Sequence, residues 1–136
     1  MIIGVGIDIQ EIDKITRSIE SAAFVRKVFT PAEAALCESK RFPGQHFSGK
    51  FALKEAFMKA IGAGIRQGIW FTDIEVLNAV TGAPYLQLYR EAQRRAAESG
   101  VASIFTSVSH SAGIAVGVVI LTQNMTANFT ASIIEK

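Results

Sequence analysis

The first residues of the chain alternate between large apolar side chains and small or polar ones. This period of two predicts a strand over residues 2–9. We expect its buried face to consist of the four odd-numbered residues, Ile3, Val5, Ile7 and Ile9. The opposite face carries Gly4 and Gly6 and ends in the carboxylate of Asp8, and the two glycines leave room there for a bulky ligand. In the alternative interpretation, Asp8 caps the following helix through the backbone near Glu11 or Ile12.

A helical period runs through residues 48–62. Leu53, Phe57 and Ile61 recur every four residues and mark the face that we expect in the core. The predicted N-cap is Ser48, and the predicted stop signals are glycines 62 and 64.

A different stripe of this helix carries charge. Phe51, Glu55 and Lys59 are spaced by four residues, and Lys50 and Lys54 stand next to the glutamate. Three lysines around one carboxylate suit a ligand with several phosphates, with Glu55 holding a divalent cation between them. The pattern is also typical of a solvated helix face with an i,i+4 Glu–Lys pair.

Three shorter helices are predicted before the long one. Isoleucines 12, 15 and 19 mark the apolar side of the first, and Ser21 caps the second. The third begins with Thr30-Pro31-Ala32-Glu33, a capping box with proline at the first helical position.

After residue 64 the period changes, and strands are expected over residues 70–78, 85–88, 104–110 and 114–121. A helix over 89–99 separates the second and third strands, and Ser111-Ala112-Gly113 joins the last two as a hairpin. Gly117, inside the last strand, indicates close approach of another backbone. The order of elements predicts an α+β fold, with an antiparallel sheet meander packed on the long helix and the short N-terminal helices.

Length and composition indicate one domain over residues 1–122 and a polar tail over 123–136. No apolar run approaches the ~20 residues needed to span a bilayer, and the N-terminus lacks the basic region of a secretory signal. The single cysteine, Cys37, cannot form an intrachain disulfide, so we expect a cytoplasmic protein. Cys37 is interpreted as a small buried packing residue, with a nucleophilic role as the alternative.

The net charge of +2 hides an asymmetry. The segment from Lys14 to Arg66 contains ten basic and four acidic residues, a net +6, whereas the rest of the chain carries −4. This polarity predicts an anionic partner for one face. Nucleic acid is disfavoured, because the chain has no recognised binding motif and no basic run.

The candidate chemistry centres on two carboxylates, Asp8 at a strand end and Glu55 within a helix. Magnesium takes a few carboxylates together with waters and phosphate oxygens, so these two acids and a pyrophosphate make a reasonable site. A zinc cluster, a Walker loop and a G-x-S-x-G elbow are absent from the sequence. His110 is either a packed, hydrogen-bonded histidine or a contact to a phosphate or a base.

These residues carry a resemblance to a known family. Gly6-Ile7-Asp8-Ile9 and the helix motif from Phe51 to Gly62 resemble the paired signatures of the holo-[acyl-carrier-protein] synthases, the small members of the 4′-phosphopantetheinyl transferase superfamily. Gly62-Ala63-Gly64, Phe71-Thr72-Asp73-Ile74-Glu75, Gly82-Ala83-Pro84 and Ser107-Val108-Ser109-His110 agree in order. The resemblance covers residue 1 to about residue 122.

The resemblance implies transfer of phosphopantetheine from coenzyme A to a serine of apo acyl carrier protein, with release of adenosine 3′,5′-bisphosphate, for fatty acid biosynthesis. It further implies a requirement for magnesium and a homotrimer with active sites between subunits. Carried over by position, Asp8 and Glu55 hold the cation and Lys59 neutralises phosphate oxygens. The implied coenzyme A contacts are Lys40, Arg41, Lys50, Lys59, Gly62, Pro84, Ser109 and His110, and the implied carrier-protein contacts are Lys14, Arg17, Phe24, Arg26 and Phe51.

Two features depart from the family pattern. Lys14 stands where an arginine is frequent, which preserves charge but loses bidentate geometry. Asp13 adds a negative charge beside the implied carrier surface. Two alternative functions remain open: a non-catalytic module that binds acidic carrier proteins, and a magnesium-dependent phosphodiesterase or pyrophosphatase that uses the same acids with water as nucleophile.

Overall fold

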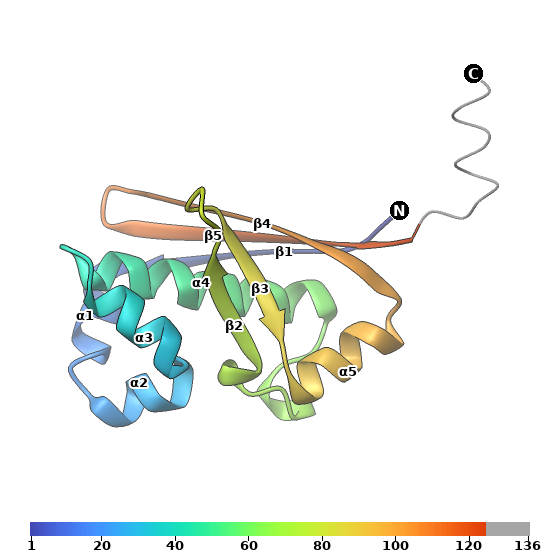
Figure 1. The fold of residues 1–136 in the computed structure, drawn as a ribbon, viewed down its shortest axis with the longest axis horizontal. Coiled ribbons are helices and arrows are strands. Elements are labelled where there is room, and N and C mark those ends of the chain that lie inside the picture. Colours follow the sequence, from blue (N-terminus) through green and yellow to red (C-terminus); the bar gives the residue numbers. More distant parts are fainter. Residues whose placement is uncertain (125–136) are drawn as a thin grey trace, which may run out of the picture.

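The computed structural model describes residues 1–124 (Figure 1). The N-terminal half contains β1 (Ile2–Glu11), α1 (Ile12–Ser18), α2 (Ala22–Val28), α3 (Pro31–Glu38) and α4 (Pro43–Ile61). Two 3₁₀ turns follow, η1 (Ile65–Gln67) and η2 (Phe71–Asp73). The remaining elements are β2 (Ile74–Asn78), β3 (Pro84–Leu88), α5 (Arg90–Glu98), β4 (Val101–Ser111) and β5 (Ile114–Gln123). This combination confirms the predicted α+β class; the predicted tail lies outside the described residues except for its first two positions.

The strands form two antiparallel sheets rather than one meander. The three-stranded sheet has the order β1-β5-β4, so the first and last strands of the described chain are neighbours. The β2–β3 pair forms a separate two-stranded sheet (Figure 1). The predicted hairpin is confirmed: Ala112 and Gly113 both have positive φ, 52° and 78°, as a two-residue turn between twisted strands requires.

Helix α4 lies directly against the three-stranded sheet because glycines face it. A Cβ at Gly6 would stand 1.9 Å from the carbonyl oxygen of Ala56, and one at Gly4 would stand 2.2 Å from that of Ala60. The backbone of Ala52 approaches Gly117 on β5 in the same way, as predicted. The glycine face of β1 is therefore the inner face, and the expectation that it leaves room for a ligand is wrong.

The burial predicted for β1 is consequently inverted. Val5, Ile7 and Ile9 are 55–61% exposed on the outer face of the sheet, and Phe105 on β4 is 58% exposed. The alternation itself is confirmed, but the pattern does not reveal which face the helix covers. The sheet thus presents an uncovered apolar surface, which we call the outer sheet face.

The long helix begins five residues earlier than predicted. Pro43 occupies its first turn, where a proline is pre-organised, and the helix continues through Ser48. The Ser48 hydroxyl donates to the carbonyl oxygen of Gly44 at 2.6 Å, so the residue lies inside the helix and is not its N-cap. The predicted end is confirmed, because Gly62 has φ 72° and its N–H donates to the carbonyl of Met58.

Two apolar clusters hold the elements together. One lies between α4, the sheet and β2, and the other joins α1, α2 and α3 to the first half of α4. Cys37 is fully buried in the second, as predicted, and burial raises the pKa of its thiol to about 12. None of the helices in residues 1–124 has the length and apolar character that crossing a bilayer requires.

Candidate active site

The contact between β1 and α4 brings Asp8, Glu55 and Lys59 together. The Lys59 ammonium donates to a carboxylate oxygen of Asp8 at 3.2 Å and to the backbone carbonyl of Ile7 at 2.9 Å. The amide of Gln10 donates to the other Asp8 oxygen at 2.6 Å. Asp8 makes no cap for α1, whose N-cap residue Glu11 has no side-chain cap bond, so the capping alternative is wrong.

Glu55 lies close enough to Asp8 and Lys59 for their charges to act on its carboxyl. Its carboxyl is half-buried, and its pKa is raised first by burial and then by the negative charge of Asp8, while Lys59 lowers it. The negative charge of Asp8 thus opposes ionisation of Glu55, and a shared divalent cation would remove this repulsion. Within residues 1–124 no three acidic, histidine or cysteine side chains are placed to hold a metal ion, so a cation here would have two protein carboxylates.

A groove of about 430 Å³ adjoins this cluster. Its walls include Glu55, Lys59, Gly62 and Phe71. Gly62, a predicted coenzyme A contact, thus lines the same groove as Glu55 and Lys59.

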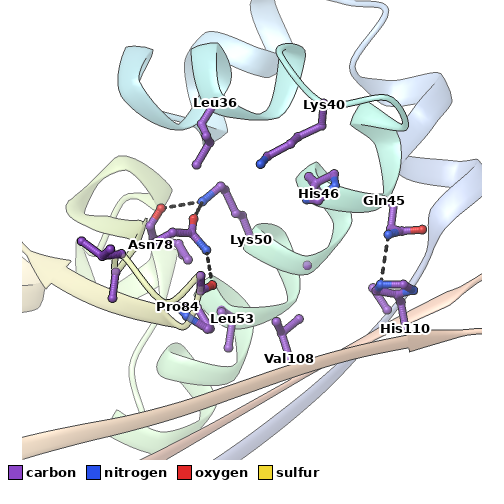
Figure 2. Close-up of a pocket in the computed structure, with 16 residues that line it drawn as sticks. Leu36, Lys40, Gln45, His46, Lys50, Leu53, Asn78, Pro84, Val108 and His110 are labelled. Carbon is purple, nitrogen blue, oxygen red and sulfur yellow. Dashed lines mark hydrogen bonds between the residues drawn. The ribbon is translucent and has the colours of Figure 1, made fainter.

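A cavity of about 590 Å³ holds the second group of predicted residues (Figure 2). It is lined by four of the predicted coenzyme A contacts, Lys40, Lys50, Pro84 and His110. Among residues 1–124, those that line it include two lysines and two histidines and no aspartate or glutamate, so the charge of the cavity favours an anion. We call it the nucleotide cavity, after the ligand that the sequence resemblance implies for these four residues.

Two polar contacts organise the walls of the nucleotide cavity. Lys50 is 6% exposed and donates to the carbonyl of Val76 at 2.7 Å and to the amide oxygen of Asn78 at 3.0 Å (Figure 2). Burial lowers the pKa of Lys50. On the other side, Gln45 and His110 share a hydrogen bond of 3.0 Å. The pKa of His46 is lowered by burial and by the neighbouring positive charges, with Lys40 first among them.

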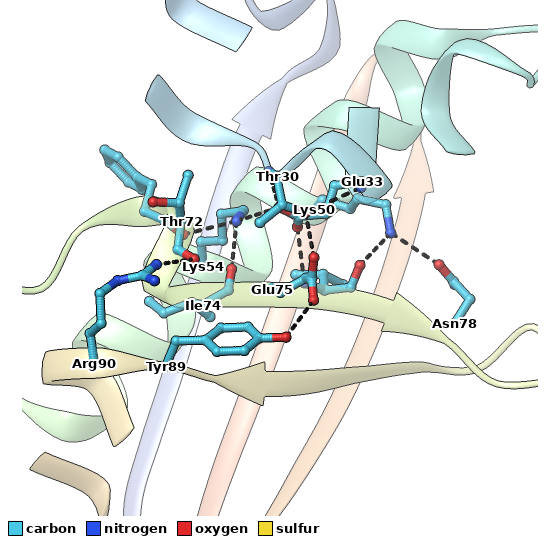
Figure 3. A network of polar contacts seen from close by, with 12 residues as sticks. Thr30, Glu33, Lys50, Lys54, Thr72, Ile74, Glu75, Asn78, Tyr89 and Arg90 are labelled. Carbon is cyan, nitrogen blue, oxygen red and sulfur yellow. Dashed lines mark hydrogen bonds and ion pairs between the residues drawn. The ribbon is translucent and has the colours of Figure 1, made fainter. Parts of the chain in front are cut away.

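Lys54, in contrast, has a structural partner. Its ammonium is fully buried and donates to Glu33 at 2.8 Å and to the carbonyls of Phe71 and Ile74 (Figure 3). The second oxygen of Glu33 accepts the N–H of Val76 at 2.9 Å. The expectation that Lys54 serves a phosphate ligand beside Glu55 is therefore wrong.

This buried pair belongs to a wider network along β2. Glu75 accepts hydrogen bonds from the hydroxyls of Thr30 at 2.5 Å and Tyr89 at 2.9 Å (Figure 3). The side chains of Glu33, Lys50 and Lys54 make hydrogen bonds to backbone groups on the edge of β2 that does not pair with β3. Side chains from α3 and α4 thus take the place of a third strand.

The two groups of site residues lie on opposite faces of α4. At about 100° per residue, Gly49, Lys50 and Leu53 point to the nucleotide cavity, whereas Glu55 and Lys59 point roughly the other way. The structure therefore brings Asp8, Glu55 and Lys59 together and brings Lys40, Lys50, Pro84 and His110 together, but does not join the two groups within one chain.

Two predicted coenzyme A contacts lie outside both groups. Arg41 is exposed and its guanidinium lies 5.3 Å from the ring centre of Phe42. Ser109 is exposed on β4, opposite Val116 of β5. Neither lines the nucleotide cavity.

The predicted carrier-protein contacts lie on the helical side of the molecule. Lys14 and Arg17 are exposed on α1, and Arg26 is exposed on α2. Phe24 and Phe51 are half-buried and pack against each other with ring centres 6.3 Å apart. Exposed basic side chains and a partly exposed aromatic pair thus both belong to the helical part of the molecule.

Sequence reasoning missed three residues of the nucleotide cavity: Gln45, His46 and Asn78. The helix predicted over residues 48–62 excludes the first two, although they belong to the first turns of α4. Proline at residue 43 was the available signal, since proline is favoured at the first position of a helix. Asn78 ends a short strand, and nothing in its spacing indicates a contact with residue 50.

Comparisons with known proteins show which proteins this chain is similar to. The sequence profile of the 4′-phosphopantetheinyl transferase superfamily matches residues 4–119. The chain is 42% identical over 112 residues to the holo-[acyl-carrier-protein] synthase of Geobacter sp. (strain M21), covering 81% of this chain and 90% of that protein. It is 43% identical over 113 residues to that of Solibacter usitatus, covering 82% and 90%.

Solved structures with the same fold include holo-[acyl-carrier-protein] synthases. The Neisseria meningitidis enzyme has a TM-score of 0.82 at 28% identity, covering 90% of this chain and all of that one. The Bacillus anthracis enzyme, solved in complex with CoA (3′,5′-ADP), has a TM-score of 0.76 at 32% identity, covering 91% and 99%. The Helicobacter pylori enzyme, in complex with coenzyme A, has a TM-score of 0.75 at 32% identity, covering 87% and 99%.

Proposed function

The chain belongs to the 4′-phosphopantetheinyl transferase superfamily, and on this premise we propose that it moves the phosphopantetheine arm of coenzyme A onto a serine of apo acyl carrier protein. The other product is adenosine 3′,5′-bisphosphate, and the reaction requires magnesium. The observation that carries this proposal is the placement of Asp8, Glu55 and Lys59 at the contact between β1 and α4.

Asp8 and Glu55 are the residues that would hold the magnesium ion. When bound there, the ion supplies charge withdrawal from the pyrophosphate of coenzyme A. Lys59 stands beside both carboxylates with a half-exposed ammonium and would neutralise phosphate oxygens as the bisphosphate leaves. Its bond to Asp8 holds it in place before the substrate arrives.

The bond changes follow from these positions. The serine oxygen of the carrier protein attacks the phosphorus that bears the pantetheine arm, and the bond from that phosphorus to the oxygen of the leaving bisphosphate breaks. The proton of the serine hydroxyl goes to the carboxylate pair of Asp8 and Glu55. The protein contributes mainly position and charge.

The nucleotide end of coenzyme A is assigned to the nucleotide cavity. Lys40 and Lys50 supply positive charge for the 3′-phosphate, and Pro84 and Val108 supply apolar wall for the adenine. Arg41 and Ser109 remain part of the proposal as contacts made from outside the cavity.

We further propose a homotrimer whose active sites are completed between subunits. Two observations support it: the outer sheet face is apolar and uncovered, and the carboxylates and nucleotide cavity lie on opposite faces of α4 in one chain. A neighbouring subunit that packs on the sheet can bring its own cavity to these carboxylates. The exposed basic residues of α1 and α2 then face the acidic carrier protein, and the enzyme works in the cytoplasm in fatty acid biosynthesis.

One assay tests the proposed function. The protein is incubated with coenzyme A, magnesium and apo acyl carrier protein, and the carrier is weighed by mass spectrometry. We expect the carrier to gain one phosphopantetheine group. An unchanged carrier that binds tightly would instead indicate a binding module, and coenzyme A cleavage without carrier would indicate a phosphodiesterase; either result contradicts the proposal.

A further inference from the structure

The nucleotide cavity contains one cation that the protein itself holds in a fixed orientation. Lys40 is an exposed residue, whereas Lys50 is 6% exposed. The ammonium of Lys50 donates hydrogen bonds to two acceptors on β2, the carbonyl of Val76 and the side chain of Asn78. A lysine ammonium has three donors, and these two bonds use two of them. One donor of Lys50 is therefore left for an anion in the cavity that it lines.

The two acceptors of Lys50 differ in kind. The carbonyl of Val76 is backbone, and it is fixed because the N–H of the same residue is held by buried Glu33. The second acceptor is the side chain of Asn78, at 3.0 Å. Asn78 is thus the side-chain acceptor that sets the direction of the ammonium.

Asn78 is itself fixed by the turn between β2 and β3. Its amide nitrogen donates to the carbonyl of Gly82 at 3.0 Å. The turn is closed by backbone bonds from Gly82 to Ala79 and from Ala79 to Ala83, of 2.8 and 2.9 Å. Val80, Gly82 and Pro84 of this segment also line the cavity. One side chain therefore connects the buried lysine to the wall of the cavity (Figure 2).

We propose that Asn78 is a positioning residue that aims Lys50 at the 3′-phosphate of coenzyme A and so sets the preference for coenzyme A over 3′-dephospho-coenzyme A. This inference rests on the proposed function, because it assumes that the nucleotide cavity receives that end of the substrate. Asn78 lines the cavity, but both ends of its side-chain amide are engaged by Lys50 and by the turn, so we assign its effect on the ligand to these two contacts. Without its oxygen the ammonium keeps one acceptor and can rotate away from the phosphate.

The test compares the dissociation constants of coenzyme A and 3′-dephospho-coenzyme A, measured by calorimetry, with kcat for carrier modification as a second readout. In Asn78→Ala we expect binding of coenzyme A to weaken about tenfold, the size of one hydrogen bond involving a charged group. Binding of the dephospho analogue is expected to change less than twofold, and kcat at saturating coenzyme A to stay within twofold of wild type. A merely structural role would weaken both ligands together.

Two further variants make the result specific. Thr81→Ala is the matched control: it removes a side-chain acceptor of the same turn, which binds the N–H of Ala83, and leaves the contacts of Lys50 intact. We expect it to change neither dissociation constant. Lys50→Gln is expected to reduce the preference for coenzyme A at least as much as Asn78→Ala does, and adding Asn78→Ala to it should cause no further loss, because Asn78 acts through Lys50.

The outcomes separate this inference from the proposed function. Wild type that transfers nothing from coenzyme A to a carrier protein would overturn the proposed function itself. If wild type transfers the group but Asn78→Ala, folded by circular dichroism, retains the wild-type preference, the inference is wrong. It is equally wrong if wild type does not distinguish the two ligands, or if the losses in the double variant add.

Discussion

Lys50, Lys54 and Lys59 stand along one helix, yet the fold gives each a different environment. Lys54 forms a buried ion pair with Glu33, and Lys50 donates a hydrogen bond to β2 at the edge of the nucleotide cavity. Of the three, Lys59 is the lysine whose charge acts on Glu55. The sequence predicted the pairing of Glu55 with Lys59 from their four-residue spacing. It could not predict the partner of Lys54, because Glu33 lies on a different helix and meets it only through tertiary packing.

Burial and the neighbouring Asp8 make the ionised form of Glu55 destabilising to the folded protein, which leads to a prediction at the residue scale. Because burial and Asp8 raise its pKa, the folded protein holds a proton that the unfolded chain releases near the ordinary value of 4.5. The stabilising contribution of this proton is fully present below pH 4.5 and is lost as pH rises through the higher folded value. We expect Glu55→Gln to be more stable than wild type at pH 7. Its free energy of unfolding, measured with urea across pH, should not show the decrease that deprotonation of Glu55 causes in wild type.

Glu20→Gln, which changes an exposed carboxyl after α1, is the control and should follow the wild-type curve. A Glu55→Gln protein that is less stable than wild type at pH 7 would show that burial of the charged form carries no penalty.

At the scale of elements, strand β1 shows what a periodic pattern can and cannot specify. Alternation predicted the strand and the common face of Gly4, Gly6 and Asp8 correctly, but assigned the wrong face to the core. The physical reason is that helix α4 needs bare backbone to come close, so the small residues are inside and the large ones are outside. A single chain cannot reveal this, because large apolar residues are equally expected where a subunit covers them.

The close approach of α4 predicts a steep cost for a single methyl group. Gly6→Ala would place its Cβ 1.9 Å from the carbonyl oxygen of Ala56, so we expect a loss of at least ~2 kcal/mol in the free energy of unfolding. Gly64→Ala is the matched control, since its Cβ would meet nothing closer than the sulfur of Met58 at 3.6 Å. Chemical denaturation of both proteins gives the comparison; equal stabilities would contradict the role assigned to Gly6.

Helix α1 leads to a prediction about the carrier protein. Arg17→Glu reverses an exposed charge on the proposed docking surface, so we expect the KM for acyl carrier protein to rise about tenfold at low salt while the KM for coenzyme A stays unchanged. Steady-state kinetics with each substrate varied in turn measures both constants. An equal rise in the two would show that α1 is not the docking surface.

At the scale of the whole molecule, the nearly complete prediction of elements contrasts with the incomplete prediction of the site. Caps, glycine stops and turn residues act locally, which is why α3, the end of α4 and the β4–β5 hairpin were predicted well. The strand predicted over residues 70–78 spans only residues 74–78 in the structure, because residues 71–73 form a 3₁₀ turn. Which residues share a cavity depends on how β2 meets α4, and no local signal encodes that contact.

The outer sheet face leads to a prediction about assembly. Ile7→Glu places a charge among exposed apolar side chains, and we expect it to convert an oligomer into monomers that remain folded. Light scattering coupled to size-exclusion chromatography measures the mass in solution. Gln93→Glu, on the exposed side of α5, is the control and should leave the mass unchanged. A monomeric wild-type protein would contradict the proposed trimer.

The central claim is that Asp8 and Glu55 act as one unit in the transfer reaction, and a double-mutant cycle tests it most directly. The rate of phosphopantetheine transfer to apo acyl carrier protein is measured by mass spectrometry for wild type, Asp8→Asn, Glu55→Gln and the double variant, with magnesium present. We expect each single change to lower kcat at least a hundredfold, and the double variant to be no slower than the worse single variant. Nearly full activity in either single variant, or losses that multiply in the double variant, would contradict the claim.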